Sequence, residues 1–390
     1  MVISKKPLRF VIAALIAFLP LVAFAQSSND SITVISTDEV VVEHSVAESH
    51  GAESHIAEPT DIKSKINAFK KHHVLDSHDM TFFSDNEEGK HFGFPLPIIL
   101  WDNGVQFFSS SKFHHGESVA ESNGNYYVLS HDNGKIYKTD AAGTLTIDEK
   151  TGNPTNVRPL DFSITKNVMF ILITSLLMFF LFTSLAKSYA KNGSISKGPG
   201  RIFEPIVLFI RDDIAIPNIG DKHYKRYMSF LLTVFFFILF LNLFGLTPLA
   251  ANVTGNLTIT FALAIIVFLI TNLTANKYYW GHIFWMPGVP KIMRIVLAPI
   301  ELLGVFIKPF SLMIRLYANI FAGHLVIMSI IGLIFIFQSW LGSSLSFGLS
   351  FALSILEILV AFLQAYIFTM LAALYFGSAS EEHHHEEQHV

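Results

Sequence analysis

The chain has 390 residues, of which 51% are apolar and only 15% are charged, and its net charge is −4. Soluble domains carry about 25% charged residues, so this composition excludes an ordinary globular protein and predicts an integral membrane protein with some soluble sequence attached. The chain contains no cysteine, which excludes a disulfide framework and thiol chemistry.

The N-terminal segment, residues 1–25, has the pattern of a secretory signal peptide. Basic residues between Lys5 and Arg9 precede an apolar run, Phe10–Leu19, and Ala23-Phe24-Ala25 forms a small-residue cleavage site. A first transmembrane helix is the alternative, but the apolar run is short for a membrane span. A signal peptide predicts an exported mature N-terminus, and hence a protein of the bacterial inner membrane.

Residues 26–160 form a polar, His-rich extension with 20 acidic and 10 basic side chains. Its first part, around Glu43–Glu58, has the composition of a flexible segment. Further on, Tyr126–Leu129 and Ile136-Tyr137 flank Asp132-Asn133-Gly134, which is a hairpin signal. We therefore expect a small β-containing domain near residues 90–150. An interaction surface on the outer side is a more plausible role for it than catalysis.

Ten histidines lie in this extension, including the pairs His72-His73 and His114-His115. They could bind a metal ion, but their spacing matches no known ligand pattern, which favours a solvated surface. For the same reason, a solvated tail is favoured over a metal site at His383-His384-His385. No cofactor and no metal ion are expected.

From about residue 166 onward, apolar segments dominate the sequence. Three of them are long enough to span a hydrocarbon layer of about 30 Å: Asn167–Ala186, Met228–Leu246 and Leu257–Thr274.

Two further apolar segments, Ile295–Trp340 and Leu345–Phe376, are much longer. At about 1.5 Å per residue, the last one alone would form roughly 48 Å of helix. Such lengths predict a hairpin of strongly tilted, curved or broken helices. Pro299 and Pro309 are natural points for a kink.

The basic residues predict the orientation of the spans. They crowd the connection between the first two spans and follow the third, whereas the connections at 247–256 and 341–344 carry no charge. They are Lys187, Lys191, Lys197, Arg201, Arg211, Lys222, Lys225, Arg226, Lys277, Lys291 and Arg294. The positive-inside rule then places the N-terminus outside and the C-terminus inside, with five crossings.

The first basic connection also predicts an interfacial amphipathic helix, because Ile202, Ile206, Phe209 and Ile210 recur at helical spacing among charged residues. The expected fold class is therefore an all-α integral membrane protein with a long, strongly tilted hairpin, this interfacial helix and a small exported region with some β structure. The expected segments are a signal peptide at 1–25, an exported extension at 26–160, a membrane domain at 161–380 and a polar cytoplasmic tail at 381–390.

Five ionisable residues interrupt the last two apolar segments: Glu301, Lys308, Arg315, His324 and Glu357. An ionisable side chain in hydrocarbon costs at least about 2.5–3.5 kcal/mol, so such residues are usually paired or line a polar path. One buried ion pair between helices is the structural alternative, but five groups exceed what helix association requires.

Helical spacing groups these residues by face. Glu301, Lys308 and Arg315 are seven apart, so a continuous helix would place them along one stripe, and Asn319 follows Arg315 by four on the same face. His324 lies nine residues beyond Arg315, about half a turn round the helix. In the last segment, Glu357 and Gln364 are seven apart and share a face.

These residue types suit proton movement. An arginine side chain stays protonated, so it attracts a carboxylate but cannot pass a proton on. Histidine and a partly buried glutamate titrate near neutral pH and can relay a proton. An arginine between two relay regions would stop protons from leaking straight through.

At these residues the sequence resembles a known family. The run from Arg315 to His324, Arg-Leu-Tyr-Ala-Asn-Ile-Phe-Ala-Gly-His, is similar to the Arg-Leu-x-x-Asn-x-x-Ala-Gly signature of ATP synthase subunit a. The stretches around Pro299–Glu301, Lys308–Leu312, Glu357–Phe368 and Asn242–Pro248 resemble other parts of that family. The resemblance covers roughly residues 161–383 and leaves 26–160 unexplained.

The resemblance implies a role for each candidate residue. Arg315 would face the essential carboxylate of a rotating c-ring, with Asn319 and Gln364 supporting it. His324 and Glu357 would line an aqueous half-channel. Further candidates in proton translocation are Asn242 and Asn256 in that half-channel and Glu301 towards the cytoplasmic access route. Some bacterial members carry the acid and the histidine of this pair in exchanged positions.

The sequence thus predicts a proton-channel stator subunit with no catalytic site of its own, since no phosphate-cradling Gly-x-x-x-x-Gly-Lys loop occurs. Its implied partners are the c-ring, the peripheral-stalk subunit b, the lipid bilayer and protons, with no nucleic acid. A self-contained ion channel or secondary transporter is the alternative, although no sign of inverted repeats supports it. A membrane-anchored exported binding protein would leave the intramembrane charges unexplained.

Overall fold

The computed structural model describes residues 76–85, 90–116, 118–130, 133–148, 154–192, 200–247, 253–285, 289–337 and 340–380. The expected signal peptide, the flexible segment at 43–58, the pair His72-His73 and the C-terminal tail lie outside these residues.

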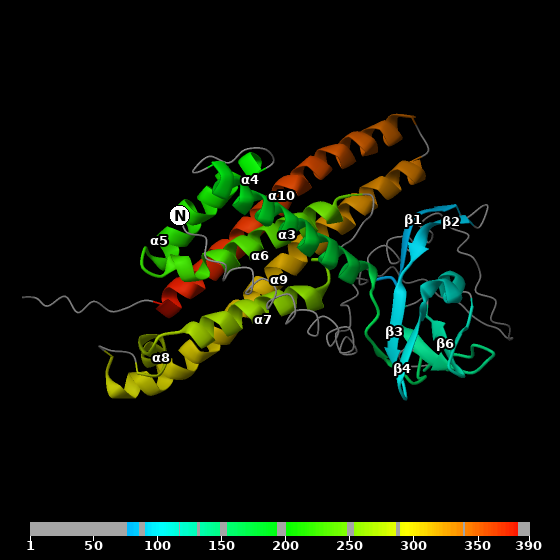
Figure 1. Ribbon diagram of the computed structural model, residues 1–390, viewed down its shortest axis with the longest axis horizontal. Coiled ribbons are helices and arrows are strands. Elements are labelled where there is room, and N and C mark those ends of the chain that lie inside the picture. Colours follow the sequence, from blue (N-terminus) through cyan, green and yellow to red (C-terminus); the bar gives the residue numbers. More distant parts are fainter. Residues whose placement is uncertain are drawn as a thin grey trace, which may run out of the picture.

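Within the described residues, five helices are long and apolar enough to cross a membrane (Figure 1). They are α3 (Lys166–Asn192), α6 (Tyr224–Gly245), α7 (Leu257–Thr274), α9 (Lys291–Phe337) and α10 (Trp340–Ser380). An unbroken apolar run of about 20 residues satisfies its own backbone hydrogen bonds as a helix, which a lipid environment requires. The expected all-α membrane fold with about five crossings is confirmed.

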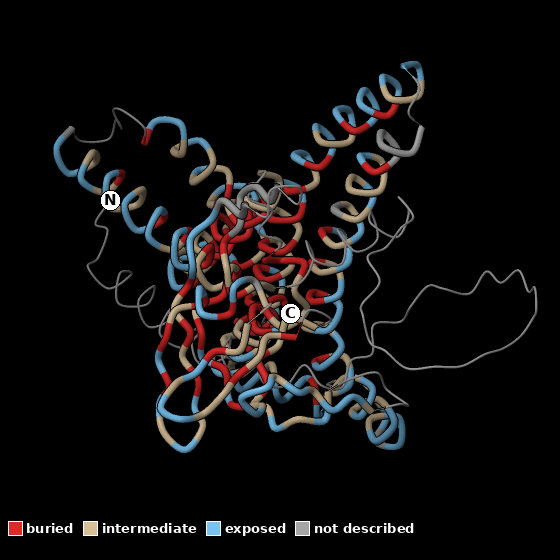
Figure 2. Tube along the Cα trace, turned by 90° about the vertical axis from the view of Figure 1, so that its right-hand side faces the viewer, coloured by how far each residue is buried: buried red, intermediate tan, exposed pale blue. Residues whose placement is uncertain are grey.

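The core of the helical part lies around α6. Leu231, Phe235, Phe236 and Ile238 of this helix are fully buried, and the ring of Phe236 meets that of Phe182 in α3 edge-on at 5.3 Å. Figure 2 shows the buried residues gathered in the middle of the molecule, whereas one end of the α9–α10 hairpin stands away from it. Edge-on aromatic pairs of this kind explain how so many phenylalanines pack in one bundle.

The α9–α10 hairpin differs from expectation in one place. Helix α9 continues through Pro299 and Pro309, which a membrane-spanning helix tolerates and which agrees with a tilted or curved helix. The connection predicted at 341–344 is wrong, since α10 already begins at Trp340. Its weak helix formers Gly342 and Ser343 lie in the first turn, where backbone N–H groups need no partner within the helix.

A short helical segment precedes α6 on the basic side of the bundle. It comprises α4 (Gly200–Phe209), the π-helical turn η2 (Ile210–Ala215) and α5 (Ile216–Ile219). Phe203, Ile206 and Phe209 pack against the core and Ile210 is fully buried, whereas Ile202 is 72% exposed. The expected amphipathic helix is present, but its buried stripe begins at Phe203 instead of Ile202.

Polar contacts lock the end of α10 to the end of α7. The Asn276 backbone N–H donates to the Ala379 carbonyl at 2.9 Å, and its side-chain Nδ2 donates to the Ser380 carbonyl at 3.1 Å. These bonds satisfy carbonyls that the last turn of a helix leaves free. Helix α8 (Lys277–Phe284) follows directly. These contacts fix the position of α10 along the axis of the bundle, and therefore also the level at which its polar residues lie.

The N-terminal part of the described chain is built from strands. They are β1 (Asp79–Asp85), β2 (Lys90–Pro95), β3 (Pro97–Trp101), β4 (Val105–Ser109), β5 (Ala120–Ser122), β6 (Asn125–Leu129), β7 (Ile136–Thr139) and β8 (Leu160–Asp161), with a 3-10 helix η1 (Ser110–Gly116) after β4. The antiparallel pairing of β6 with β7 confirms the predicted hairpin. A core that includes Ile98, Phe108, Phe113 and Tyr127 lies between the sheet β4-β3-β8 and the sheet β5-β6-β7.

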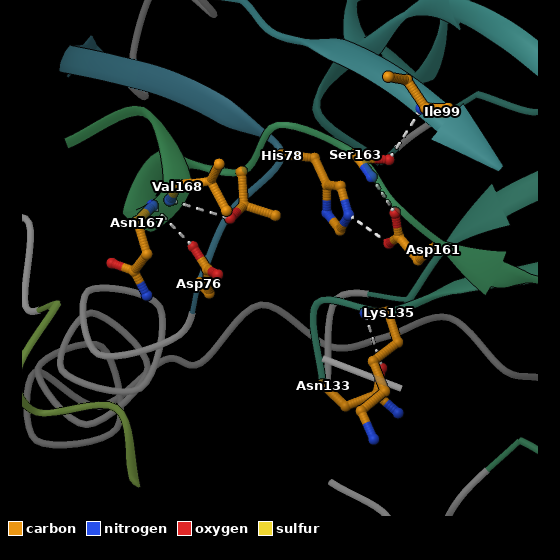
Figure 3. Close-up of polar contacts among 10 residues, drawn as sticks. Asp76, His78, Ile99, Asn133, Lys135, Asp161, Ser163, Asn167 and Val168 are labelled. Atoms are coloured by element: carbon orange, nitrogen blue, oxygen red, sulfur yellow. Dashed lines mark hydrogen bonds and ion pairs between the residues drawn. The ribbon is translucent and has the colours of Figure 1, made fainter. Parts of the chain in front are cut away.

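This β region is joined to the first residues of α3 by hydrogen bonds (Figure 3). The Asn167 backbone N–H donates to Asp76 Oδ1 at 3.1 Å, and the Lys166 N–H donates to the Ser77 carbonyl at 2.9 Å. Met80 of β1 belongs to the same buried cluster as Phe170 of α3. The β region therefore caps the first membrane-spanning helix and packs on its end.

A buried ion pair closes the same junction. His78 Nε2 lies 2.8 Å from Asp161 Oδ2, and Asp161 Oδ1 accepts a hydrogen bond from the Ser163 N–H at 2.9 Å (Figure 3). Burial by itself would lower the pKa of His78, but the hydrogen bond and charge of Asp161 raise it above its ordinary value. Burial alone would raise the pKa of Asp161, but His78 and Ser163 hold it below its ordinary value.

Candidate functional site

Two of the predicted site residues bond to each other across the hairpin. Asn319 Nδ2 on α9 donates to Gln364 Oε1 on α10 at 2.8 Å. Gln364 is buried, whereas Asn319 is exposed on the surface of the chain. The spacing of Arg315 and Asn319, one helical turn apart, puts both side chains on that face of α9.

Arg315 differs from Asn319 in having no hydrogen bond or ion pair to any residue that the structure describes. It is half-buried, and it interacts electrostatically with the Tyr375 hydroxyl of α10. Lys308, seven residues earlier, lies with its Nζ 5.6 Å from the centre of the same Tyr375 ring. Both cations therefore interact with the same tyrosine side chain, which supports the prediction that Lys308 and Arg315 lie on one stripe of α9.

Two small cavities, each with a volume of about 10 Å³ and lined by both apolar and polar residues, lie along α9 on opposite sides of Arg315. A volume of this size holds about one water molecule. The first cavity, at Lys308 and Pro309, is also lined by Thr271, Asn272, Tyr279, Tyr375 and Ser378. The second, at Ile320, is lined by Asn242, Thr254 and Glu357 together with Gly245, Leu246 and Ala361.

Glu357 is the acid of the second cavity. Only 7% of this residue is exposed, and its Oε2 has no hydrogen-bond partner among the described residues. Helix α9 reaches it through Gly323, where a Cβ atom would come within 2.9 Å of Glu357 Oε1. A larger residue at this point would push the Glu357 carboxyl group out of its position.

Asn242 also lines this second cavity. Its Oδ1 accepts a 2.7 Å hydrogen bond from Thr254 Oγ1, and its Nδ2 lies 3.5 Å from the Ala361 carbonyl. The residue is 2% exposed. The amide thus links the end of α6 to α10 and to the chain before α7.

The other predicted residues lie elsewhere. Asn256 begins α7, where its Oδ1 accepts the Thr258 N–H at 3.0 Å as a helix cap. Glu301 interacts electrostatically with Tyr279 of α8, at the same end of α9 as the first cavity. His324 belongs to α9, but its side chain lies outside the described part of the chain.

Most of the residues that line these cavities are not predicted from the sequence, and Thr254 and Tyr375 are two of them. Tyr375 follows Gln364 by eleven residues and Glu357 by eighteen, so the helical period places all three on one stripe of α10. That spacing could have identified it. Thr254 lies before α7 in an irregular stretch, where no periodicity indicates its partner.

The arrangement defines a class of protein. Five helices that are long and apolar enough to cross a membrane carry polar side chains together with the cations Lys308 and Arg315, and charged groups in membrane-spanning helices commonly mark an ion or proton path. This is a multi-pass membrane protein with the residue types of an ion or proton path.

Comparisons with known proteins identify the family. Residues 168–377 match the family described as ATP synthase A chain. The chain is 42% identical over 235 residues to ATP synthase subunit a of Chloroherpeton thalassium. The aligned residues cover 59% of this chain and 70% of that relative. The chain is 43% identical over 237 residues to ATP synthase subunit a of Myxococcus xanthus, covering 59% and 77%, and 38% identical over 281 residues to that of Pelodictyon phaeoclathratiforme, covering 70% and 80%. The chain belongs to the ATP synthase A chain family.

A second match covers the β region. Residues 69–162 match a family described as a domain of unknown function (DUF8433). The match ends four residues before α3 begins at Lys166, so the β region and the membrane-spanning helices match two separate family descriptions.

Proposed function

We propose that the chain is the proton-conducting stator subunit of a rotary ATP synthase. In this role the two cavities are parts of two half-channels that do not connect directly. Arg315 stands between them and faces the proton-carrying carboxylate of a c-ring. The proposal is carried by the position of Arg315, a half-buried cation without a hydrogen bond to any described residue, between one cavity that Lys308 lines and another that Glu357 lines.

The residues then divide the work between them. Glu357, with His324, takes up protons in the half-channel that Asn242 and Thr254 line. Lys308, Tyr375 and Glu301 lie on the route at the other end of α9. Asn319 and Gln364 keep α9 and α10 in register beside Arg315. Asn256 acts through the start of α7, because its side chain caps that helix.

Arg315 is a barrier and an electrostatic latch in this mechanism. Its guanidinium stays charged and cannot accept a proton, so it cannot relay one. It attracts the ionised ring carboxylate, which must give up its proton to pass. A membrane potential of 100 mV supplies about 2.3 kcal/mol for each charge that crosses.

The orientation follows from the charges. The basic connections after α3 and α7 belong on the cytoplasmic side of a bacterial inner membrane, and the β region and the tip of the α9–α10 hairpin belong outside. The proposed partners are the c-ring and the peripheral-stalk subunit b. No reaction on ATP is assigned to this chain.

The test is ATP-driven proton pumping in membrane vesicles from a strain that carries Arg315→Ala. We expect pumping to fall to background while the complex still assembles, because the barrier between the cavities is gone. Arg211→Ala is the matched control, since that arginine is paired with Asp212 away from the cavities, and it should pump normally. Coupled pumping by Arg315→Ala would contradict the proposal. Proton flux through the purified chain without a ring would favour the alternative, a self-contained transporter.

A further inference from the structure

The sheet β4-β3-β8 is apolar on both of its faces. Its inward residues, such as Ile98, Leu100 and Phe108, form the core of the β region. Its outward residues include Ile99, Trp101, Val105, Phe107, Leu160 and Phe162, here called the apolar sheet face.

These outward side chains are neighbours across the strands. Trp101 pairs with Val105 on one side and with Leu160 on the other, and Ile99 pairs with Phe107. Trp101 is 56% exposed and Phe107 is 68% exposed. None of the outward positions on these three strands is charged.

An antiparallel sheet with one face in water normally alternates apolar residues inside with polar residues outside. The second sheet of the same region has an outward row of Glu121, Tyr126 and Thr139. The apolar sheet face is the exception. A contiguous exposed apolar patch marks a site of contact with a protein or a membrane.

The fold holds this face next to the membrane. Phe162 comes four residues before the start of α3 at Lys166, so their Cα atoms are at most about 14 Å apart. The bonds from Asp76 and Ser77 to the first turn of α3 prevent the β region from swinging away. In the view of Figure 1, β3 and β4 lie on the side of the β region nearer the helices, with β6 beyond them.

The direction of the face follows from this order. The inward side chains of β3 and β4 pack on Tyr127 of β6 and its neighbours. Their outward side chains therefore point the opposite way, which in the view of Figure 1 is the side of the helices.

We propose that the apolar sheet face lies on the bilayer, with Trp101, Phe107 and Phe162 at the boundary between lipid headgroups and acyl chains. Tryptophan and other amphipathic or aromatic side chains gather at this depth of a membrane. The β region is then a peripheral membrane anchor as well as a cap on α3. Lipid is the occupant that fits, because the face is uncharged, is rich in aromatic side chains and ends at Phe162, four residues before the start of a membrane-spanning helix.

Photocrosslinking in the assembled ATP synthase in its native membrane tests the proposal. A photoreactive benzophenone amino acid replaces Phe107, and in a second strain it replaces Glu121, which lies on the sheet directed away from the helices. After illumination, mass spectrometry of this chain's peptides identifies the adducts. We expect phospholipid adducts at position 107 at least ten-fold above those at position 121. Adducts to another subunit, adducts to residues 26–75 of this chain, or equal lipid adducts at both positions would each overturn it.

A second measurement reports depth without a crosslinking reaction. The chain has no cysteine, so Phe107→Cys and Glu121→Cys each provide one thiol for a fluorescent label, in a complex whose other subunits carry no reactive thiol. Brominated acyl chains should quench the label at position 107 several-fold more than the label at position 121. Equal quenching at the two positions, with equal access to aqueous iodide, places the face in water and rejects the proposal.

Discussion

At the scale of single residues, the polar side chains between α9 and α10 differ in what they bond to. Asn319 and Gln364 satisfy each other, and Asn242 bonds to Thr254. Arg315 and the Glu357 Oε2 atom lack such partners among the described residues. Amide pairs are suited to holding helices in place, whereas an unpaired cation and an unpaired carboxyl oxygen are available to a moving charge.

Gly323→Ala should impair proton flow without unfolding the chain. The added Cβ would lie 2.9 Å from Glu357 Oε1 and would force the carboxyl group out of its place. Alanine itself favours a helix by about 1 kcal/mol over glycine, so loss of helix stability cannot be the cause. We expect ATP-driven pumping to fall several-fold in vesicles with normal assembly.

The control for this change is Gly348→Ala on α10, where a Cβ would meet nothing within 4 Å. Its pumping should equal that of the wild type. Normal pumping by Gly323→Ala would show that the approach of α9 to Glu357 is unimportant for proton transfer.

The His78–Asp161 pair predicts how the stability of the β region depends on pH. The raised pKa of His78 means that its contribution is present below about pH 6.5, the ordinary histidine value, and is lost as pH rises through the folded-state pKa. The lowered pKa of Asp161 means that its contribution is present above about pH 3.9 and is lost only in stronger acid. Asp76 and Asp79 also face the imidazole and favour its charged form.

Hydrogen exchange of the β3 and β8 amides, corrected for intrinsic rates, measures this dependence. Protection should be greater at pH 5.5 than at pH 8.5, and His78→Gln should remove the difference. His114→Asn removes an exposed histidine of the same region, at a position whose positive φ of 42° suits asparagine, and should keep it. Protection that rises with pH in the wild type would refute the assignment.

Whether a pair of interacting residues can be predicted from the sequence depends on how many residues separate the two partners in the chain. The stripe of Arg315 and Asn319 and that of Glu357 and Gln364 follow from helical spacing, and the structure places Asn319 beside Gln364. The His78–Asp161 pair spans 83 residues, so no local pattern indicates it. The resemblance implied Asn256 as a half-channel residue, and the structure shows that its side chain caps the start of α7.

At the scale of elements, the start of α3 is capped from two directions. Thr165 Oγ1 accepts the Val168 N–H at 3.5 Å, and Asp76, 91 residues earlier than Asn167, accepts the Asn167 N–H. A carboxylate near a helix N-terminus is also favoured by the helix dipole. A membrane-spanning helix thus depends on a side chain from the β region.

Asp76→Ala should loosen this junction. Losing an N-cap typically costs about 1 kcal/mol, so hydrogen exchange of the amides at 166–168 should accelerate about five-fold at neutral pH. Asp140→Ala is the control, since Asp140 accepts hydrogen bonds from Thr144 in an exposed turn of the same region. Equal exchange at 166–168 in wild type and Asp76→Ala would mean that Thr165 alone caps the helix.

The elements themselves were predictable to different degrees. Apolar runs predict α3, α6 and α7 to within a few residues, because lipid allows only helices or closed barrels. For α9, which includes Pro299 and Pro309, the sequence left tilted, curved and broken helices open, because a proline permits each of them in a membrane-spanning segment. The stripe of α4 was misplaced by one residue for a similar reason, since only the packed partner α6 selects Phe203 over Ile202.

At the scale of the whole molecule, a helical part that belongs to one family carries a β region that matches another. Both parts share the residues around α3, where Met80 joins the helical core. If the β region rests on the bilayer as proposed, it adds a broad contact with the membrane to the outer end of the bundle. The composition predicted a polar extension and a membrane domain. It did not predict how the β region attaches to α3, because the residues in contact there lie far apart in the sequence.

The last strand of the β region has a consequence for the order of events during synthesis. Strand β8 and its Asp161 close the sheet beside β3, and they leave the ribosome immediately before α3. The β region therefore cannot complete its fold until the first membrane-spanning helix is emerging. The last step in folding of the β region and the insertion of α3 into the membrane are therefore close in time, and the cap on α3 is completed only once that helix is being made.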